Sequence, residues 1–391
     1  MKLWTDCDVN AEVDRFVLSG ETALDQKLLK YDVIASMAHA EMLEKTGILT
    51  AGENKKLQQA LESILELDEN GEFLIKPEEE DSHTAIENYL IEKTGDAGRK
   101  IHTARSRNDQ ALAAERLYVR EGLEKIISSS KRLIEVLDKT SRKYNGIPMP
   151  GYTHMRKAMP SAVSMWLDSL KEALQDDIVM IKSAKKMINQ NPLGTGAGYG
   201  VPMKVDRELT RRLLGFEKTQ QNPIYVQNSR GKFELLMLHS LEQVMIDISK
   251  MATDMLVFST EEFGYISLPE EICHGSSMMP QKKNPDVLEI MRAKAAIFSS
   301  YGSQIAALIT NLPSGYSANF RLTKEPLIKG LETAEECIRV MAIVADCIEV
   351  NEKRCRDAMT PELFATEKAY RLVETGMPFR KAYRNVKKNL K

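Results

Sequence analysis

Three long stretches of this chain are typical of helices, with Gly or Pro only near their ends. In the first, from Pro160 to Gln190, apolar side chains recur at three- and four-residue steps. These side chains are Val163, Leu167, Leu170, Leu174, Ile178, Ile181, Ala184 and Ile188. The other two runs extend from about Lys232 to Phe258 and from about Pro285 to Ile309. Because helices of this length gain stability chiefly by packing, the sequence predicts a helix bundle with loops at its ends.

The composition allows a large core and gives no general attraction to polyanions. Of the 391 residues, 43% are hydrophobic, and 54 Lys plus Arg nearly balance 56 Asp plus Glu for a formal net charge of −2. This balance predicts no nucleic-acid partner and no binding to an anionic membrane. The N-terminus lacks an apolar signal segment, and no run of about 18 apolar residues occurs. We therefore expect neither secretion nor membrane insertion.

The cysteine and histidine patterns predict no metal and no cofactor. The cysteines are odd in number and form no Cys-x-x-Cys pair, which disfavours a disulfide framework and a zinc cluster. They are Cys7, Cys273, Cys337, Cys347 and Cys355. No two histidines lie at metal-ligand spacing with a carboxylate or cysteine in a helix. The simplest location for such a chain is a reducing cytoplasm.

The segment from Gly275 to Pro285, Gly-Ser-Ser-Met-Met-Pro-Gln-Lys-Lys-Asn-Pro, has the composition of a catalytic loop. Gly275 makes its beginning pliable, Pro280 stiffens its middle, and Pro285 stands where a helix can begin. Its candidate functional groups are those of Ser276, Lys282 and Asn284. A hydroxyl, a cation and an amide close together suit a substrate that carries a carboxylate. The alternative is an ordinary solvated connection, since Gly, Ser, Pro and Asn are first of all turn residues.

Several motifs in order resemble the fumarase/aspartase superfamily and, within it, the argininosuccinate lyases. The loop resembles the superfamily signature Gly-Ser-x-x-Met-Pro-x-Lys-x-Asn-Pro. Residues 102–110 (His-Thr-Ala-Arg-Ser-Arg-Asn-Asp-Gln) and 150–154 (Pro-Gly-Tyr-Thr-His) are similar to two further signature regions of argininosuccinate lyases. Residues 2–4 and 191–197 also look like that family. The resemblance implies an all-α fold, a long-helix bundle with smaller N- and C-terminal helical domains, and assembly as a homotetramer.

We expect three domains in chain order. Residues 1–101 form an N-terminal helical domain, 102–350 the central long-helix bundle, and 351–391 a short C-terminal helical segment. The acidic stretch 68–81, interrupted by Gly and Pro, reads as a surface connection before a helix. The chain stops at Lys391, earlier than the pattern of the family, as expected for a shortened cap or for a truncated product.

The resemblance implies a lyase of arginine biosynthesis that splits argininosuccinate into fumarate and arginine by β-elimination. This reaction removes a weakly acidic Cβ proton next to a carboxylate, so it needs a base and positive groups where charge accumulates. The resemblance assigns the base to Ser276, with Ser277 as the second choice. Lys282 and Asn284 are suited by their chemistry to the carboxylate.

His154 is the candidate partner on the side of the leaving group. Glu289 is expected to hold and polarise its imidazole through a hydrogen bond. A structural role is the alternative for each residue, and for Glu289 it is a first-turn charge that complements the helix dipole.

Ser106, Arg107 and Asn108 form a compact group of anion-binding side chains. A planar guanidinium with neighbouring hydroxyl and amide donors matches a carboxylate. The resemblance implies that they hold the succinyl end of the substrate together with Thr153. A solvated surface cluster is the alternative. His83 is expected to contact these anion-binding side chains without contacting the substrate itself.

The region 316–324 departs from the pattern of the family. Tyr316 and Lys324 match it and are implied to contact the substrate, whereas Arg321 stands where the family has a glutamine. Such an arginine either repels the guanidinium of the substrate or grips a carboxylate. The nearest alternative is therefore a related enzyme that releases fumarate from another N-succinyl compound. A non-catalytic structural protein, like the lens delta-crystallins, is the next alternative.

Overall fold

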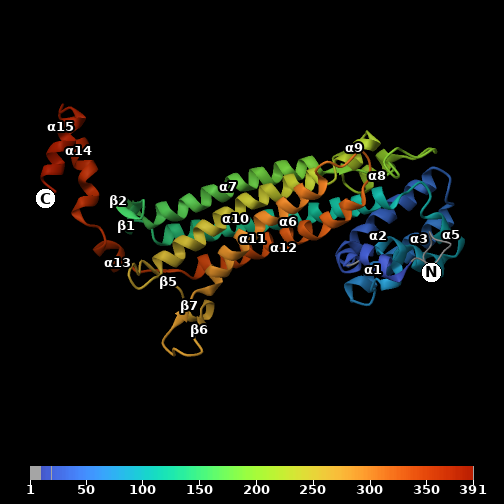
Figure 1. Ribbon diagram of the computed structural model, residues 1–391, viewed down its shortest axis with the longest axis horizontal. Coiled ribbons are helices and arrows are strands. Elements are labelled where there is room, and N and C mark those ends of the chain that lie inside the picture. The colour runs from blue at the N-terminus through green and yellow to red at the C-terminus, as the bar shows by residue number, and fades with distance from the viewer. Residues whose placement is uncertain (1–9, 19, 391) are drawn as a thin grey trace. The chain divides into compact units, whose positions relative to one another are not determined.

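The computed structural model describes residues 10–18 and 20–390 and divides them into two compact, mainly helical units (Figure 1). Unit 1 comprises the described residues of Met1–Lys125, Met180–Leu241 and Ser299–Glu332. Unit 2 comprises those of Ile126–Val179, Glu242–Phe298 and Thr333–Lys391. Residues 2–4, which carry one of the motif similarities, lie outside the described residues.

Unit 1 begins with short and medium helices, of which α2, α3, α4 and α5 share one apolar core. They are α1 (Ala11–Leu18), α2 (Glu21–Lys45), α3 (Ala51–Glu69), the 3₁₀ turn η1 (Pro77–Glu79), α4 (Ser82–Thr94) and α5 (Asp96–Lys100). Fully buried leucine and isoleucine side chains of α2, α3 and α4 form this core, among them Leu43, Leu61 and Leu90. A capping box begins α3, because Thr50 Oγ1 accepts from Glu53 N at 3.2 Å and Glu53 Oε2 accepts from Thr50 N at 2.8 Å.

The rest of unit 1 consists of parts of long helices and their connections. They are the first part of α6 (Arg107–Lys143), the end of α7 (Val163–Ile188), β3 (Gln190–Asn191), α8 (Arg207–Leu213), β4 (Lys218–Thr219), α9 (Pro223–Asn228), the start of α10 (Lys232–Phe258), the end of α11 (Asp286–Ile309), η3 (Ala318–Thr323) and the start of α12 (Lys324–Cys347). β3 and β4 pair in parallel. A second core cluster joins α2 to α6 through Tyr31, Ala35, Ala113 and Leu117. This packing places α2 beside the beginning of α6.

Unit 2 contains the remaining parts of α6, α7, α10, α11 and α12, which run side by side (Figure 1). Its other elements are β1 (Pro148–Thr153), β2 (Arg156–Ala162), β5 (Ile266–Ser267), η2 (Glu270–Ile272), β6 (His274–Gly275), β7 (Lys283–Asn284), β8 (Glu349–Val350), α13 (Glu352–Asp357), η4 (Pro361–Phe364), α14 (Ala365–Glu374) and α15 (Phe379–Lys388). Three antiparallel pairs, β1–β2, β5–β8 and β6–β7, connect the helices. The fold is therefore the all-α, long-helix type that the sequence predicts.

The three predicted long helices are confirmed as α7, α10 and α11. All eight apolar positions of the first run are buried, as the three- and four-residue spacing requires. One boundary differs: Pro160 and the two residues after it belong to β2, where Pro160 lies opposite Pro150. Proline lacks an N–H and fits the short edge strand better than the start of a helix. The division into three consecutive domains stays a prediction. The two compact units are a different kind of division, because each combines non-consecutive segments of the chain.

None of the described helices is both long and apolar enough to cross a membrane.

Gly98 allows α5 to approach α4 closely, and its replacement is expected to destabilise unit 1. A Cβ at Gly98 would lie 2.5 Å from Ile91 N and from Leu90 C, both backbone atoms that cannot turn away. We expect Gly98→Ala to lower the free energy of unfolding by about 1–3 kcal/mol through overpacking. The control Gly52→Ala, in α3 with nothing within 4 Å of the new Cβ, should be neutral or stabilising by up to about 1 kcal/mol. Urea unfolding of both variants makes the comparison, and equal midpoints would contradict the close-packing account.

Candidate active site

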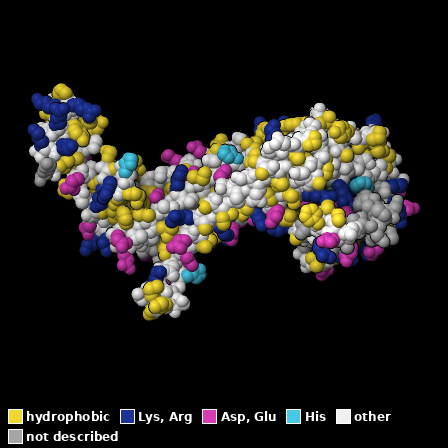
Figure 2. Space-filling view, viewed as in Figure 1, with side chains coloured by type: hydrophobic (Ala, Val, Ile, Leu, Met, Phe, Trp, Pro, Cys, Tyr) yellow, Lys and Arg dark blue, Asp and Glu magenta, His cyan; other side chains and the backbone are white. Residues whose placement is uncertain are grey.

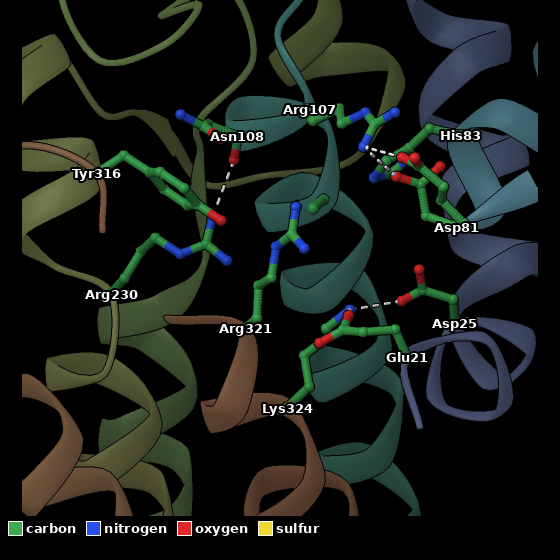
Figure 3. Close-up of a pocket in the computed structure, with 12 residues that line it drawn as sticks. Glu21, Asp25, Asp81, His83, Arg107, Asn108, Arg230, Tyr316, Arg321 and Lys324 are labelled. Carbon is green, nitrogen blue, oxygen red and sulfur yellow. Dashed lines mark hydrogen bonds and ion pairs between the residues drawn. The ribbon is translucent and has the colours of Figure 1, made fainter. Parts of the chain in front are cut away.

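A pocket of about 100 Å³ in unit 1 gathers five of the predicted substrate-binding side chains (Figure 3). They are Arg107, Asn108, Tyr316, Arg321 and Lys324. The other described residues that line it are Glu21, Asp25, Glu80, Asp81, His83, Ala111 and Arg230. Residues far apart in the sequence thus meet where α2, the start of α4, the start of α6 and the η3–α12 junction come together.

Arg107 is the first residue of α6 and is already bonded to carboxylates. Its Nη1 lies 2.9 Å from Glu80 Oε2 and 3.2 Å from Asp81 Oδ2. Asp81 also caps α4, because its Oδ1 accepts from Thr84 N at 2.9 Å. The guanidinium predicted to bind a carboxylate is therefore held by two acidic side chains of the chain itself.

Hydrogen bonds at the start of α6 fix the backbone around Ser106 and Asn108. Ser106 Oγ accepts from Asn108 N at 3.2 Å, and Ser106 N donates to Asp109 Oδ1 at 2.9 Å. The second oxygen of Asp109 accepts from Gly194 N at 3.0 Å and Gly196 N at 2.9 Å. Burial raises the pKa of Asp109 to about 6, although these N–H groups oppose the rise. Asp109 thus joins the two motif regions 102–110 and 191–197.

Arg230 and Arg321 line the pocket and make no ion pair with a carboxylate among the described residues, although Glu21 and Asp81 lie near enough to Arg321 to raise its pKa. The Arg230 guanidinium lies over the rings of Tyr316, at 5.5 Å, and Phe320, at 5.6 Å, and donates to Asn108 O at 3.0 Å. Burial alone would lower the pKa of Arg321, but its hydrogen bond with Tyr316 and nearby carboxylates raise it. Both side chains are charged and lie along the pocket (Figure 3).

Lys324 is buried and donates to two carboxylates of α2. Its Nζ bonds Glu21 Oε2 and lies 2.7 Å from Asp25 Oδ1. Burial would lower the pKa of Lys324, but the two carboxylates outweigh that effect and raise it. Sequence reasoning missed Glu21 and Asp25, although their four-residue spacing puts both on one helix face. Nothing local links them to a lysine that is 299 residues from Asp25.

His83 is held by a buried carboxylate. Its Nδ1 bonds Asp32 Oδ2, which also accepts from Ser82 Oγ at 2.8 Å, while Asp32 Oδ1 accepts from Gln110 Nε2 at 2.8 Å. The pKa of His83 is raised, because the Asp32 charge and hydrogen bond outweigh burial. These contacts fix the imidazole ring in the wall of the pocket.

Ser276 and Lys282 lie in unit 2, on the loop between β6 and β7 (Figure 1). The Ser276 hydroxyl accepts from Met279 N at 3.1 Å and from Met278 N at 3.3 Å. The Lys282 side chain is exposed, and Asn284 closes the loop in β7. As predicted, α11 begins directly after Pro285.

The base of this loop is held by a hydrogen bond between side chains. His274 Nδ1 lies 2.8 Å from Asp286 Oδ1, next to the His274–Asn284 pair of the β6–β7 ladder. Glu289 is exposed in the first turn of α11.

His154 lies at the tip of the β1–β2 hairpin and not in a simple loop. His154 and Met155 have φ of 52° and 57°, as a type I′ turn requires, and His154 is exposed. Thr153 is the last residue of β1. His154 and Glu289 make no hydrogen bond with each other in the described chain, and the β1–β2 and β6–β7 hairpins lie apart within unit 2 (Figure 1). The hydrogen bond between His154 and Glu289 therefore stays a prediction, and within a single chain the two side chains do not form it.

Within residues 10–18 and 20–390, no group of three or more His, Cys, Asp or Glu side chains is placed to hold a metal ion.

The chain is similar to known lyases over nearly its whole length. The profile of a family described as lyase matches residues 11–297. An argininosuccinate lyase of Thermotoga neapolitana is 46% identical over 98% of this chain and 97% of its own length. An argininosuccinate lyase of Phocaeicola vulgatus is 42% identical over 98% of this chain and 86% of its own.

A solved structure of EDDS lyase in complex with formate superposes with a TM-score of 0.81 and 25% identity. It covers 97% of this chain and 76% of that one. The long-helix fold and the sequence identities agree, and the chain belongs to the argininosuccinate lyase family.

Proposed function

We propose that this protein cleaves argininosuccinate to fumarate and arginine by β-elimination. The observation that carries the proposal is the mixed charge of the pocket in unit 1. Carboxylates from α2 and from the start of α4 line one part, and Arg230 and Arg321 line another (Figure 3). A substrate with carboxylates at both ends and a guanidinium in the middle matches such a lining. The names of the two bacterial relatives support the same substrate.

In the proposed reaction, Ser276 takes the Cβ proton of the succinyl group. The electron pair left on Cβ forms the double bond of fumarate as the bond from Cα to the guanidinium nitrogen breaks. A serine needs help to act as a base, and the Met278 and Met279 N–H groups that donate to its Oγ favour a negatively charged oxygen. Lys282 adds a positive charge on the same loop.

We propose that Lys282 and Asn284 stabilise the charge that accumulates on the carboxylate. The succinyl end is proposed to be bound by Ser106, Arg107, Asn108 and Thr153. Tyr316, Arg321 and Lys324 are assigned to the rest of the substrate. His154, polarised by Glu289, gives a proton to the leaving nitrogen. No cofactor is required by this chemistry.

We infer that the site is completed by self-association, as a homotetramer. The loop with Ser276 and the hairpin tip with His154 lie apart within unit 2, and both side chains belong to short, protruding turns. Partner chains are the simplest source of the missing groups. The absence of a Cys-x-x-Cys pair supports a location in the cytoplasm.

Two other functions stay open to experiment. A different N-succinyl amine would be the substrate if Arg321 excludes the guanidinium, and a non-catalytic protein would release no fumarate at all. The loop keeps the hydroxyl of Ser276, the ammonium group of Lys282 and the amide of Asn284, and these groups favour an enzyme over a non-catalytic protein.

The first prediction separates these functions by fumarate release and tests the base. The purified protein is expected to release fumarate from argininosuccinate, measured by its ultraviolet absorbance. Ser276→Ala should lower kcat by at least roughly 10²-fold, because a positioned base contributes about that much or more. Ser277→Ala, on the same loop and exposed, is the matched control and should keep most activity. Loss of activity in Ser277→Ala alone would move the base to Ser277.

The second prediction concerns Arg321. Because Arg321 lines the pocket and makes no ion pair with a carboxylate among the described residues, we expect it to bind a substrate carboxylate. Arg321→Gln should then lower kcat/KM for argininosuccinate by roughly 10- to 100-fold, as the loss of a charged hydrogen bond typically does. Arg212→Gln, which removes an exposed arginine of α8, is the control. A rise in kcat/KM on Arg321→Gln would show instead that Arg321 repels the substrate.

The third prediction tests whether one active site combines residues from different chains. Ser276→Ala and His154→Asn, each inactive alone, should regain part of the activity after mixing and subunit exchange if the two residues of one site come from different chains. Exchange between two samples of Ser276→Ala is the control and should regain none. A fully active monomer in dilute solution, measured by light scattering with the assay, would contradict the self-association proposal.

A further inference from the structure

A glycine-rich loop in unit 1, residues 194–200 (Gly-Thr-Gly-Ala-Gly-Tyr-Gly), carries a large exposed side chain, that of Tyr199. The backbone of the loop is fixed by hydrogen bonds to all four glycines. Thr195 O accepts from the N–H groups of two of them at 2.9 and 3.2 Å, and the Asp109 carboxylate accepts from the other two at 2.9 and 3.0 Å. The Tyr199 side chain therefore protrudes from a well-held base.

The Tyr199 phenol lies on Gly315, in the connection between α11 and η3. A Cβ at Gly315 would lie 3.1 Å from Tyr199 Oη and 3.9 Å from its Cζ, so the phenol fills the space of a side chain there. Gly315 has a φ of 105°, and its N donates to Asn228 Oδ1 at 2.8 Å. Asn228 Nδ2 in turn donates to Ser314 Oγ at 3.2 Å. The connection is thus held by the side chain of Asn228 and by contact with Tyr199.

The end of α9 joins this connection to the glycine-rich loop. Gly198, directly before Tyr199, lies against Gln227, because a Cβ at Gly198 would be 2.8 Å from Gln227 Cγ. The next residue of α9, Asn228, bonds Gly315. Tyr199 adds a direct contact between two loops that both rest on α9.

Gly315 directly precedes Tyr316, whose side chain lines the pocket and points toward Arg230 (Figure 3). The Arg230 guanidinium lies 5.5 Å from the centroid of the Tyr316 ring. The Tyr316 hydroxyl forms a hydrogen bond with Arg321. A displacement of Tyr316 would therefore change the contacts that orient both arginines.

Resting on the proposed function, we propose that Tyr199 is a positioning residue for the reaction. By lying on Gly315, it keeps Tyr316 in place. Tyr316 in turn orients the guanidinium groups of Arg230 and Arg321. Tyr199 itself is not among the described residues that line the pocket.

A purely packing role makes a different prediction. Loss of a packing residue lowers the free energy of unfolding and leaves substrate binding unchanged. Tyr199 is 73% exposed, so its removal should change stability little. Its effect should appear in the mobility of the Gly315 connection and in KM.

The experiment compares Tyr199→Ala with the wild-type, full-length protein by hydrogen exchange, urea unfolding and steady-state kinetics with argininosuccinate. We expect faster exchange in residues 313–317 and an unchanged urea midpoint. KM should rise by roughly 5- to 20-fold with kcat within about twofold, because groups that bind the substrate are misplaced and the proton-transferring groups are not. Tyr199→Phe keeps the ring over Gly315 and should have a KM close to that of wild type. Tyr370→Ala, which removes an exposed tyrosine of α14, is the matched control and should resemble wild type.

Gly315→Ala tests the same contact from the other loop. The new methyl group would meet Tyr199 Oη and should also raise KM. Because both changes disturb one contact, the double variant should raise KM by less than the product of the two single effects. A full product would mean that the two residues act independently, which contradicts the inference.

Unchanged exchange in residues 313–317 of Tyr199→Ala overturns the inference, because Tyr199 then does not hold the connection. Faster exchange or a lower urea midpoint with an unchanged KM is the result of a packing role and also overturns it. So does a KM in Tyr199→Phe as high as in Tyr199→Ala.

The proposed function is judged separately, by fumarate release from argininosuccinate with the wild-type protein. The exchange measurement needs no substrate, so it tests the contact of Tyr199 whether or not the wild type releases fumarate. An active wild type with the same KM as Tyr199→Ala would reject this inference alone.

Discussion

Burial of apolar stripes along the long helices is the constraint on which the rest of the structure depends. The stripe of α7 is buried at every predicted position, and α10 and α11 are uninterrupted over their whole lengths. A helix that must keep one face against its neighbours leaves little room for chemistry along its middle. The candidate site residues accordingly lie at helix starts, hairpins and junctions, where the chain is free to change direction.

The pocket in unit 1 illustrates how such junctions carry charge. Arg107 begins α6, Asp81 caps α4, and Lys324 begins α12, so each charged group stands at the start of a helix. Cations and carboxylates meet there in small clusters, because a charge removed from water needs a partner. The pocket is lined by both carboxylates and cations, a mixture that suits a substrate carrying both kinds of charge.

The loop of β6 and β7 follows a different design. Its base is tied by a short ladder and by the His274–Asp286 hydrogen bond, whereas Lys282 and the residues around it are exposed. A loop with a fixed base and a free tip can reach a ligand held elsewhere without disturbing the helices. The exposed His154 turn has the same character, and its positive φ values keep it tightly folded while it protrudes.

The sequence by itself determined the helical fold, the extents of α10 and α11, most of α7 but not its first residues, and the start of α11 after Pro285. These features follow from local rules, namely apolar spacing and the effects of proline and glycine. It also singled out Arg107, Tyr316, Arg321 and Lys324 through motifs, but not their surroundings. Only the tertiary structure decided that Lys324 bonds Glu21 and Asp25 and that Arg107 bonds Glu80 and Asp81. Such contacts join residues with no local relation in the chain, because they arise from the packing of helices and not from any spacing along one of them.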